Sequence, residues 1–159
     1  MQEGFSNRLS SKALTYWQWY GFLTFLPFWL FPIAYFFSSK YFFFPIWPIY
    51  VFIVVFLMLT LLKTFIIPKI IWNRWRYKVS EHDINIQYGL WIVKHTIIPM
   101  VKVQHVNTKQ GPLMKGFGLA SVSISTAASI HEIPALEEDV AAALRNRISI
   151  LARVVDEDV

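Results

Sequence analysis

The chain lacks cysteine, is poor in glycine and has almost no charge in its first third. Without cysteine, disulfide bonds and thiolate chemistry are excluded. The glycines form no phosphate-binding loop, because Gly116-Phe117-Gly118 lacks the third glycine and the Lys-Ser/Thr pair that such loops need. Across residues 13–62 the only charged side chain is Lys40. These absences leave an apolar stretch that requires its own explanation.

The charge-poor stretch consists of two apolar runs, residues 13–39 and 41–62, which are 27 and 22 residues long. A bilayer-spanning helix needs roughly 20 mostly apolar residues. We predict a membrane hairpin with spans at residues 14–37 and 46–67 and a tight turn at the polar residues 38–41. Ionisable groups inside a span usually mark ion pathways or proton relays. No such group lies deep in either span, which favours an anchor over a self-contained transporter.

The flanking charges predict the orientation of this hairpin. The N-terminal side carries Arg8 and Lys12, and the loop carries Lys40 alone. From residue 63 to residue 78 there are five basic residues and no acid; we call this set the basic collar: Lys63, Lys69, Arg74, Arg76 and Lys78. Because Lys and Arg collect on the cytoplasmic side, we predict a multi-pass protein with both termini cytoplasmic.

The N-terminal segment, residues 1–12, is short and polar, and we expect it to be poorly ordered. The apolar run that follows is much longer than the about 7–15 residues of a signal peptide, and no small-residue cleavage site follows it. We therefore expect no cleavage.

The hydrophobic pattern changes from Arg74 onward. Alternating apolar and polar residues predict half-buried strands, which we place at residues 84–90, 91–98, 101–108, 122–126 and 129–133. Gly89 and residues 110–112 are expected to be turns. Ser121, Ser123 and Ser125 alternate along one strand and are expected to face solvent.

After Pro134 the apolar period becomes helical. The predicted apolar face contains five residues: Leu136, Val140, Leu144, Ile148 and Leu151. Acidic side chains precede this face and basic ones follow it, which suits the helix dipole. Five or six antiparallel strands covered by one C-terminal helix is an α+β arrangement.

Several segments resemble the bacterial pleckstrin-homology-like (PH-like) domain. They are residues 98–106 (IPMVKVQHV), 110–112 (QGP), 117–119 (FGL) and 123–127 (SISTA). With two preceding spans and the aromatic, basic residues 72–77 (WNRWRY), the whole chain resembles the YdbS-type small membrane proteins. The resemblance implies a bacterial cytoplasmic-membrane protein that accompanies a larger membrane protein with repeated PH-like domains.

Together these observations predict the fold class and the domains. We expect a membrane α-helical hairpin of two transmembrane helices, followed by an α+β PH-like β-barrel or sandwich with a C-terminal helix. The expected divisions are an N-terminal cytoplasmic tail at residues 1–13, the hairpin at 14–67 and the PH-like domain at 68–159.

Catalytic and metal-binding patterns are weak in this sequence. The four histidines, His82, His95, His105 and His131, lie on separate elements without metal-ligand spacing. No Gly-x-Ser-x-Gly motif is present, and the resemblance transfers no catalytic residue. We expect a protein that is not an enzyme, with no catalytic residue, cofactor or metal. The basic residues adjoin the membrane segment, so we expect no nucleic-acid partner.

Two surfaces are candidate binding sites. The basic collar is expected to face anionic lipid headgroups, where each Lys or Arg gains about 1 kcal/mol; the alternative is that it only determines topology. Lys115 and Phe117 are a possible partner surface, since exposed strand edges can accept a peptide from another chain. The alternative is that Phe117 belongs to the core.

We therefore expect a non-enzymatic, membrane-anchored binding or scaffold module in a cytoplasmic-membrane complex. The family context implies a cell-envelope role, such as envelope stress or tolerance of membrane-active peptides. The alternative is an accessory subunit of a membrane transport or efflux assembly.

Overall fold

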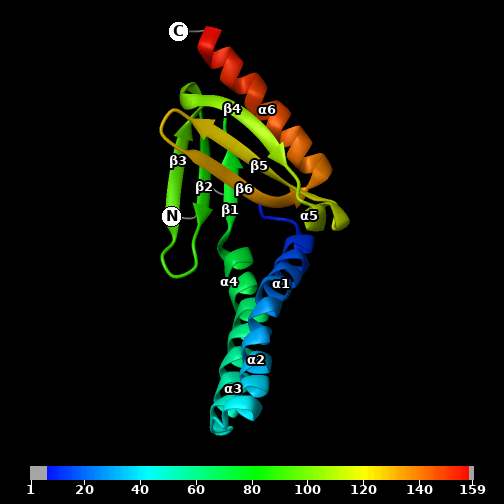
Figure 1. Ribbon diagram of the computed structural model, residues 1–159. Helices are drawn as coiled ribbons and strands as arrows, with labels where there is room; N and C mark the ends of the chain where they lie inside the picture. Colours follow the sequence, from blue (N-terminus) through cyan, green and yellow to red (C-terminus); the bar gives the residue numbers. More distant parts are fainter. Residues whose placement is uncertain (1–6, 158–159) are drawn as a thin grey trace. The chain divides into compact units, whose positions relative to one another are not determined.

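A computed structural model describes residues 7–157. The chain forms two compact units. One is helical and comprises Trp17–Lys69; the other joins the residues up to Tyr16 with those from Ile70 onward. Each unit is described separately below (Figure 1).

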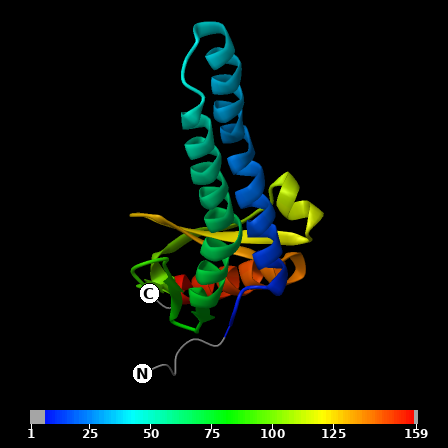
Figure 2. The same cartoon turned by 90° about the horizontal axis from the view of Figure 1, so that it is seen from below.

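The helical unit is built from two long helical runs that lie side by side (Figures 1 and 2). The first contains α1 (Ser11–Phe25), the 3₁₀ turn η1 (Leu26–Trp29) and α2 (Leu30–Phe42). The second contains α3 (Trp47–Leu61), the π-helical turn η2 (Leu62–Ile66) and α4 (Ile67–Arg74). Both runs, Ser11–Phe42 and Trp47–Arg74, are long and apolar enough to cross a membrane.

Prolines explain both irregular turns. Pro27 lies in η1, as expected for a residue that cannot donate its helical hydrogen bond. Pro68 lies in α4, just after η2, where the Ile67 amide donates to the Leu62 carbonyl five residues earlier. Pro68 has no N–H to offer to the Thr64 carbonyl, so the widened turn precedes it.

The turn between the spans lies at residues 43–46, and the prediction of a turn at 38–41 is wrong. Ser39 remains inside α2, where its hydroxyl donates to the Phe36 carbonyl at 2.8 Å. A serine bonded in this way does not interrupt a helix. The chain instead turns at Phe43, which adopts a left-handed conformation (φ 54°), shortly before Pro45.

The second unit contains two three-stranded antiparallel sheets. The first sheet has β1 (Arg76–Val79), β2 (Asp83–Tyr88) and β3 (Lys94–Pro99) in that order. The 3₁₀ turn η3 (Met100–Lys102) leads to the second sheet, which has β4 (Val103–Lys109), β5 (Leu119–Thr126) and β6 (Ile130–Glu137). The short helix α5 (Pro112–Gly116) joins β4 to β5, and α6 (Glu138–Glu157) follows β6.

The predicted α+β composition is confirmed, whereas a closed barrel is not. Within residues 7–157, no strand of one sheet pairs with a strand of the other. Both sheets contribute fully buried side chains, such as Ile84 and Ile86 from the first and Val122 and Ile124 from the second. The domain is therefore a pair of small sheets over a shared core, with α6 along the second sheet (Figures 1 and 2).

The C-terminal helix begins later than predicted. Strand β6 continues past Pro134 to Glu137, so Leu136 is a buried strand residue. The register shifts where β5 passes from Ala120 to Val122, and Ala135 on β6 has φ 50°. A bulge on an edge strand accommodates a proline. The buried face of α6 consists of Ala141, Leu144 and Ile148, and Val140 is exposed.

The prediction that the β5 serines face solvent is wrong for two of the three. Ser121 and Ser123 are only 1% and 3% exposed, because both faces of the central strand β5 are covered. The Ser121 hydroxyl lies 3.9 Å from the Met114 sulfur on α5. Alternation of polar and apolar residues was misleading here because small serines also pack in a core.

The N-terminal segment is attached to the domain, contrary to the expectation of poor order for residues 7–12. Asn7 and Tyr77 exchange two backbone hydrogen bonds of 3.2 Å each. The indole N–H of Trp72 donates to the Ser10 carbonyl at 3.0 Å. Leu9 is buried. The rest of that prediction, residues 1–6, lies outside the described part of the chain.

Two predicted strands begin later than expected. Residues 91–93 precede β3 as a loop, so only Lys94–Pro99 pairs with β2. Residues 101 and 102 belong to η3 before β4 starts at Val103. Runs of β-branched residues predicted strand in both places, but the chain must turn between partners there.

Candidate functional site

A polar groove lies between β4 and α6 on the domain. It has a volume of about 290 Å³. The lining residues come from two elements, Val103, Gln104, His105, Val106 and Asn107 on β4 and Ser149, Ala152 and Arg153 on α6. We call it the β4–α6 groove.

Strand β4 is suited to pairing with another chain. It stands at the edge of its sheet and pairs only with β5. Its side chains alternate, with Val103 and Val106 half-buried and Gln104, His105 and Asn107 exposed. A bulge between Val103 and His105 lies within the groove. An edge strand can accept an extended peptide through backbone hydrogen bonds, and here exposed polar side chains line the same edge.

Arg153 contributes the one formal charge among the described residues that line the groove. It is exposed on α6 and therefore available to a carboxylate or phosphate group. The groove thus combines backbone pairing with one cationic group.

Sequence analysis did not find this groove. The alternation of valine with polar residues along 103–107 indicated a strand but not its position at an edge. Ser149 and Arg153 lie more than forty residues farther along the chain, and nothing in the sequence pattern joins them to β4.

The basic collar is divided between the two units. Lys63 and Lys69 are exposed on the helical unit. On the domain, Arg74 donates through Nη1 to the Leu90 carbonyl at 2.7 Å, and Arg76 donates through Nη1 to the Trp75 carbonyl at 2.6 Å. Lys78 lies half-buried on β1. The five basic residues are therefore not equivalent.

Arg76 also has an electrostatic neighbour that the collar did not include. Desolvation by burial, followed by the nearby charge of Arg8, lowers the pKa of Arg76 from its usual value. Arg8 follows Asn7, whose backbone pairs with Tyr77 on β1. The ordered N-terminal segment thus adds positive charge next to Arg76.

The predicted partner residues lie at the end of α5. Lys115 is exposed, whereas Phe117 is half-buried. The Phe117 ring packs edge-to-face on Tyr16 with 6.3 Å between centroids. Gly118 follows in a left-handed conformation (φ 64°) and returns the chain to β5. The structure therefore separates this pair from the β4–α6 groove.

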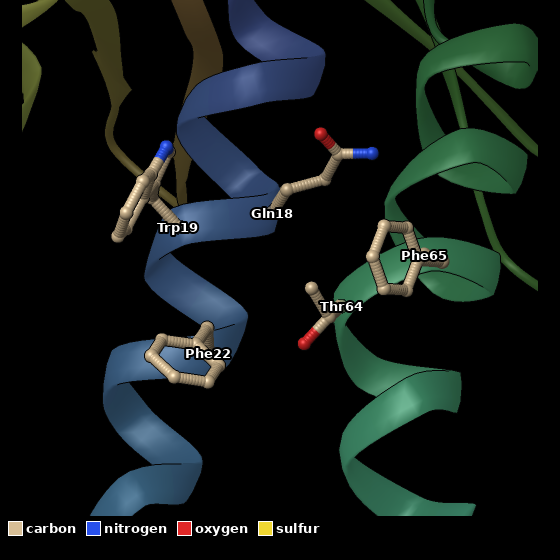
Figure 3. Close-up of a pocket in the computed structure, with 5 residues that line it drawn as sticks. All are labelled: Gln18, Trp19, Phe22, Thr64 and Phe65. Atoms are coloured by element: carbon tan, nitrogen blue, oxygen red, sulfur yellow. The ribbon is translucent and has the colours of Figure 1, made fainter.

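The helical unit carries a second concave surface (Figure 3). A pocket of about 280 Å³ is lined by Gln18, Trp19 and Phe22 on α1 and by Thr64 and Phe65 on η2. The Thr64 hydroxyl is buried and has no hydrogen-bond partner within the described residues. Figure 3 shows Gln18 extending into the space between the two helices.

Close helix contact explains why Thr64 is buried. A Cβ atom added to Gly21 would lie 2.7 Å from the Lys63 carbonyl oxygen, so only glycine fits there. Farther along the hairpin, the Trp29 indole N–H donates to the Thr60 hydroxyl at 3.2 Å. These contacts hold the two runs together in a medium that offers no hydrophobic drive for helix association.

No metal centre is visible in the described chain. Among residues 7–157, no three His, Asp or Glu side chains gather into a group that could hold an ion. His131 lies 2.7 Å from the Ser129 hydroxyl through Nε2, within one strand-end turn.

Comparison with known proteins identifies the family. The family model described as "Bacterial PH domain" matches residues 13–152. The "UPF0699 transmembrane protein YdbS" of Bacillus subtilis (strain 168) is 46% identical over 159 residues, which is 100% of both chains. No solved structure matches. The predicted resemblance is thereby confirmed, and the chain belongs to the bacterial PH-domain family as a transmembrane member that resembles YdbS along its whole length.

Proposed function

We propose that this protein is a non-enzymatic binding module that scaffolds a protein complex at the cytoplasmic membrane. The observation that carries the proposal is the β4–α6 groove, in which an edge strand borders a polar cleft on a domain joined to two apolar helices. In this proposal the hairpin, residues 14–67, anchors the domain of residues 68–159, and both termini are cytoplasmic.

The ligand proposed for the groove is an extended segment of another protein. Backbone groups along β4 would pair with it, and the exposed side chains of Gln104 and Asn107 would select among sequences. Arg153 favours an acidic group in that segment. A larger membrane protein with repeated PH-like domains is the proposed source, because the family resemblance implies such a companion.

The basic collar is proposed to contact anionic headgroups. Lys63, Lys69 and Lys78 make no hydrogen bond or ion pair that the structure defines, unlike Arg74 and Arg76, whose guanidinium groups bind backbone carbonyls. We expect Lys→Gln changes at the three lysines to weaken the salt-sensitive binding to anionic vesicles. The binding free energy should fall by about 1 kcal/mol for each charge removed. Unchanged binding would leave the collar with a topological role only.

The test of the proposed function compares two arginines on α6. Arg153 lines the groove, whereas Arg147 is exposed on the same helix but does not line it. Full-length protein and the variants Arg153→Glu and Arg147→Glu would be crosslinked in native membranes and their partners identified by mass spectrometry. We expect Arg153→Glu to reduce recovery of the main partner at least tenfold and Arg147→Glu to preserve it.

Equal recovery with both variants would reject the groove as the partner site. The same pair of variants addresses the physiological role. A deletion strain sensitive to membrane-active peptides should be complemented by Arg147→Glu and not by Arg153→Glu.

A specific observation favours a second function, an accessory subunit of a transport assembly. The pocket on the hairpin brings two polar side chains, Gln18 and Thr64, together beside a π-helical turn. Such turns often occur at functional sites. If transport in vesicles with the partner is lost when the spans are replaced by plain leucine helices, this second function is supported. Retained function would favour the anchor.

A further inference from the structure

The loop between β2 and β3, residues 89–93, presents two large apolar side chains to solvent. Trp91 is 90% exposed and Ile92 is 77% exposed. Neither residue lines the β4–α6 groove. Exposed aromatic and aliphatic residues at the same loop tip are unfavourable in water, and adjacent ones often mark a surface that is covered in the working protein.

The strand register places this loop beside residues 74–76, the segment that connects α4 to β1. Arg76 at the start of β1 is paired with Gln87 on β2. One residue earlier, the Trp75 ring stacks on Tyr88 with 5.9 Å between centroids. One residue earlier again, Arg74 at the end of α4 donates to the Leu90 carbonyl at 2.7 Å. The loop therefore continues antiparallel to the chain, beside the last turn of α4.

The loop is held in this path by a glycine. Gly89 has φ 148°, and a Cβ atom added there would lie 2.0 Å from the Ile92 carbonyl oxygen. Only glycine permits this close turn. Gly89 permits the close turn, and Arg74 binds the carbonyl of the next residue, Leu90. Both lower the entropy cost of binding through Trp91 and Ile92.

Distance and charge favour a bilayer as the surface that covers the tip. From the predicted end of the second span at residue 67, Arg74 is seven residues away, or about 10 Å at the rise of an α-helix. The headgroup region on each side of a bilayer is about 5–8 Å thick. The loop residues 89–93 carry no acid and Lys94 follows them, while Asp83, the acid of β2, lies at the opposite end of that strand.

We propose that the β2–β3 loop inserts Trp91 and Ile92 into the headgroup–acyl boundary of the bilayer that holds the hairpin. Tryptophan prefers this boundary. Lys94 then lies at headgroup level, where a cation is favourable. The loop then attaches the domain to the bilayer at a point separate from the two spans.

The absence of native cysteine makes a direct test possible. Single cysteines replace Ile92 or, as the matched control, the exposed His82 in the turn between β1 and β2. Each full-length variant is spin-labelled and reconstituted into vesicles of phosphatidylcholine and phosphatidylglycerol. We expect the label at position 92 to collide at least threefold more with oxygen than with a water-soluble nickel complex, and the label at 82 to show the reverse.

A second measurement avoids labelling of the loop. Brominated lipids should quench the fluorescence of Trp91, taken as the difference between the full-length protein and Trp91→Phe. Water-like accessibility at position 92 together with no quenching of Trp91 would overturn the proposal. Burial of position 92 only in native membranes, and not in pure lipid vesicles, would also overturn it and assign the tip to a protein partner.

Failure here can be told apart from failure of the proposed function. Arg153→Glu removes a groove residue and should leave the position-92 label at the same depth. If Arg153→Glu loses the partner while the position-92 label stays at the same depth in the bilayer, the result concerns the groove and leaves the insertion of the loop unaffected.

Discussion

The two units use large apolar side chains in opposite ways. In the helical unit, Phe31 and Val54 are 65% and 64% exposed, and α3 is apolar on all sides. In the domain, Ile84, Val122 and Ile148 are fully buried, and α6 has one apolar face. The contrast shows that the helical unit is made for an apolar surrounding medium and the domain for water.

Each unit contains an exception to its own rule, and both exceptions are candidates for a functional role. The helical unit buries a polar hydroxyl, that of Thr64, beside a glycine contact. The domain exposes Trp91 and Ile92. Features that cost stability in their own surroundings are those most in need of a functional reason.

The largest expected difference between the units comes from the same truncation made in each. Ile84→Ala should destabilise the domain by about 2–5 kcal/mol, because it removes buried apolar atoms and leaves a cavity. Ile33→Ala, at a side chain that is 51% exposed on α2, should cost about 0.5 kcal/mol or less, since lipid replaces the lost contacts. Chemical denaturation of the full chain in detergent measures both costs, with hydrogen exchange at β2 for the domain and at α2 for the helical unit. Equal costs would show that the helical unit is a water-exposed or self-packed element.

A smaller effect is expected where the helical unit packs against itself. Gly21→Ala places a Cβ atom against the Lys63 carbonyl and should weaken the hairpin by about 1–3 kcal/mol. Hydrogen exchange of the amides around Trp29 and Thr60 in detergent would report the change as faster exchange. Gly116→Ala is the control, because a Cβ atom there meets nothing within 4 Å. If Gly21→Ala left these exchange rates unchanged, the two runs would not be in the described contact.

The smallest effect concerns pH and the domain alone. Burial raises the pKa of Tyr77 above its usual value of 10.0. A raised folded-state pKa means that the unfolded chain releases this proton first as pH rises. The stability tied to neutral Tyr77 is therefore complete below about pH 10 and declines above it. Tyr77→Phe should show a shallower loss of stability between about pH 9 and 11 in urea titrations. If Tyr77→Phe loses stability with pH as steeply as the parent chain, the pH dependence arises from other tyrosines.

Sequence reasoning succeeded where one local property is sufficient. Length and apolar content alone identify residues 13–62 as two candidate spans, because a helix in lipid needs no particular partner for its faces. The C-terminal helix was recognised because Leu144 and Ile148 follow a helical period. The family was recognised from short segments of the domain in their order along the chain, and the comparisons confirmed it.

It failed where the conformation of a residue depends on distant partners. Pro134 would end an interior strand, yet the edge strand β6 passes it through a bulge at Ala135. Ser121 and Ser123 read as a solvent face, yet both faces of β5 are covered. Residues 7–12 read as a free tail, yet Asn7 pairs with Tyr77 and Ser10 accepts from Trp72.

By itself, the amino-acid sequence determined the two apolar helices, the α+β class and the basic collar, since each follows from composition or from a short-range period. Only the tertiary structure decided that β4 lies at a sheet edge beside Arg153, that Arg74 binds the loop carrying Trp91, and that Gly21 meets Lys63. The reason is physical: these contacts join residues many positions apart, and their energies depend on burial and geometry that arise only when the chain is folded.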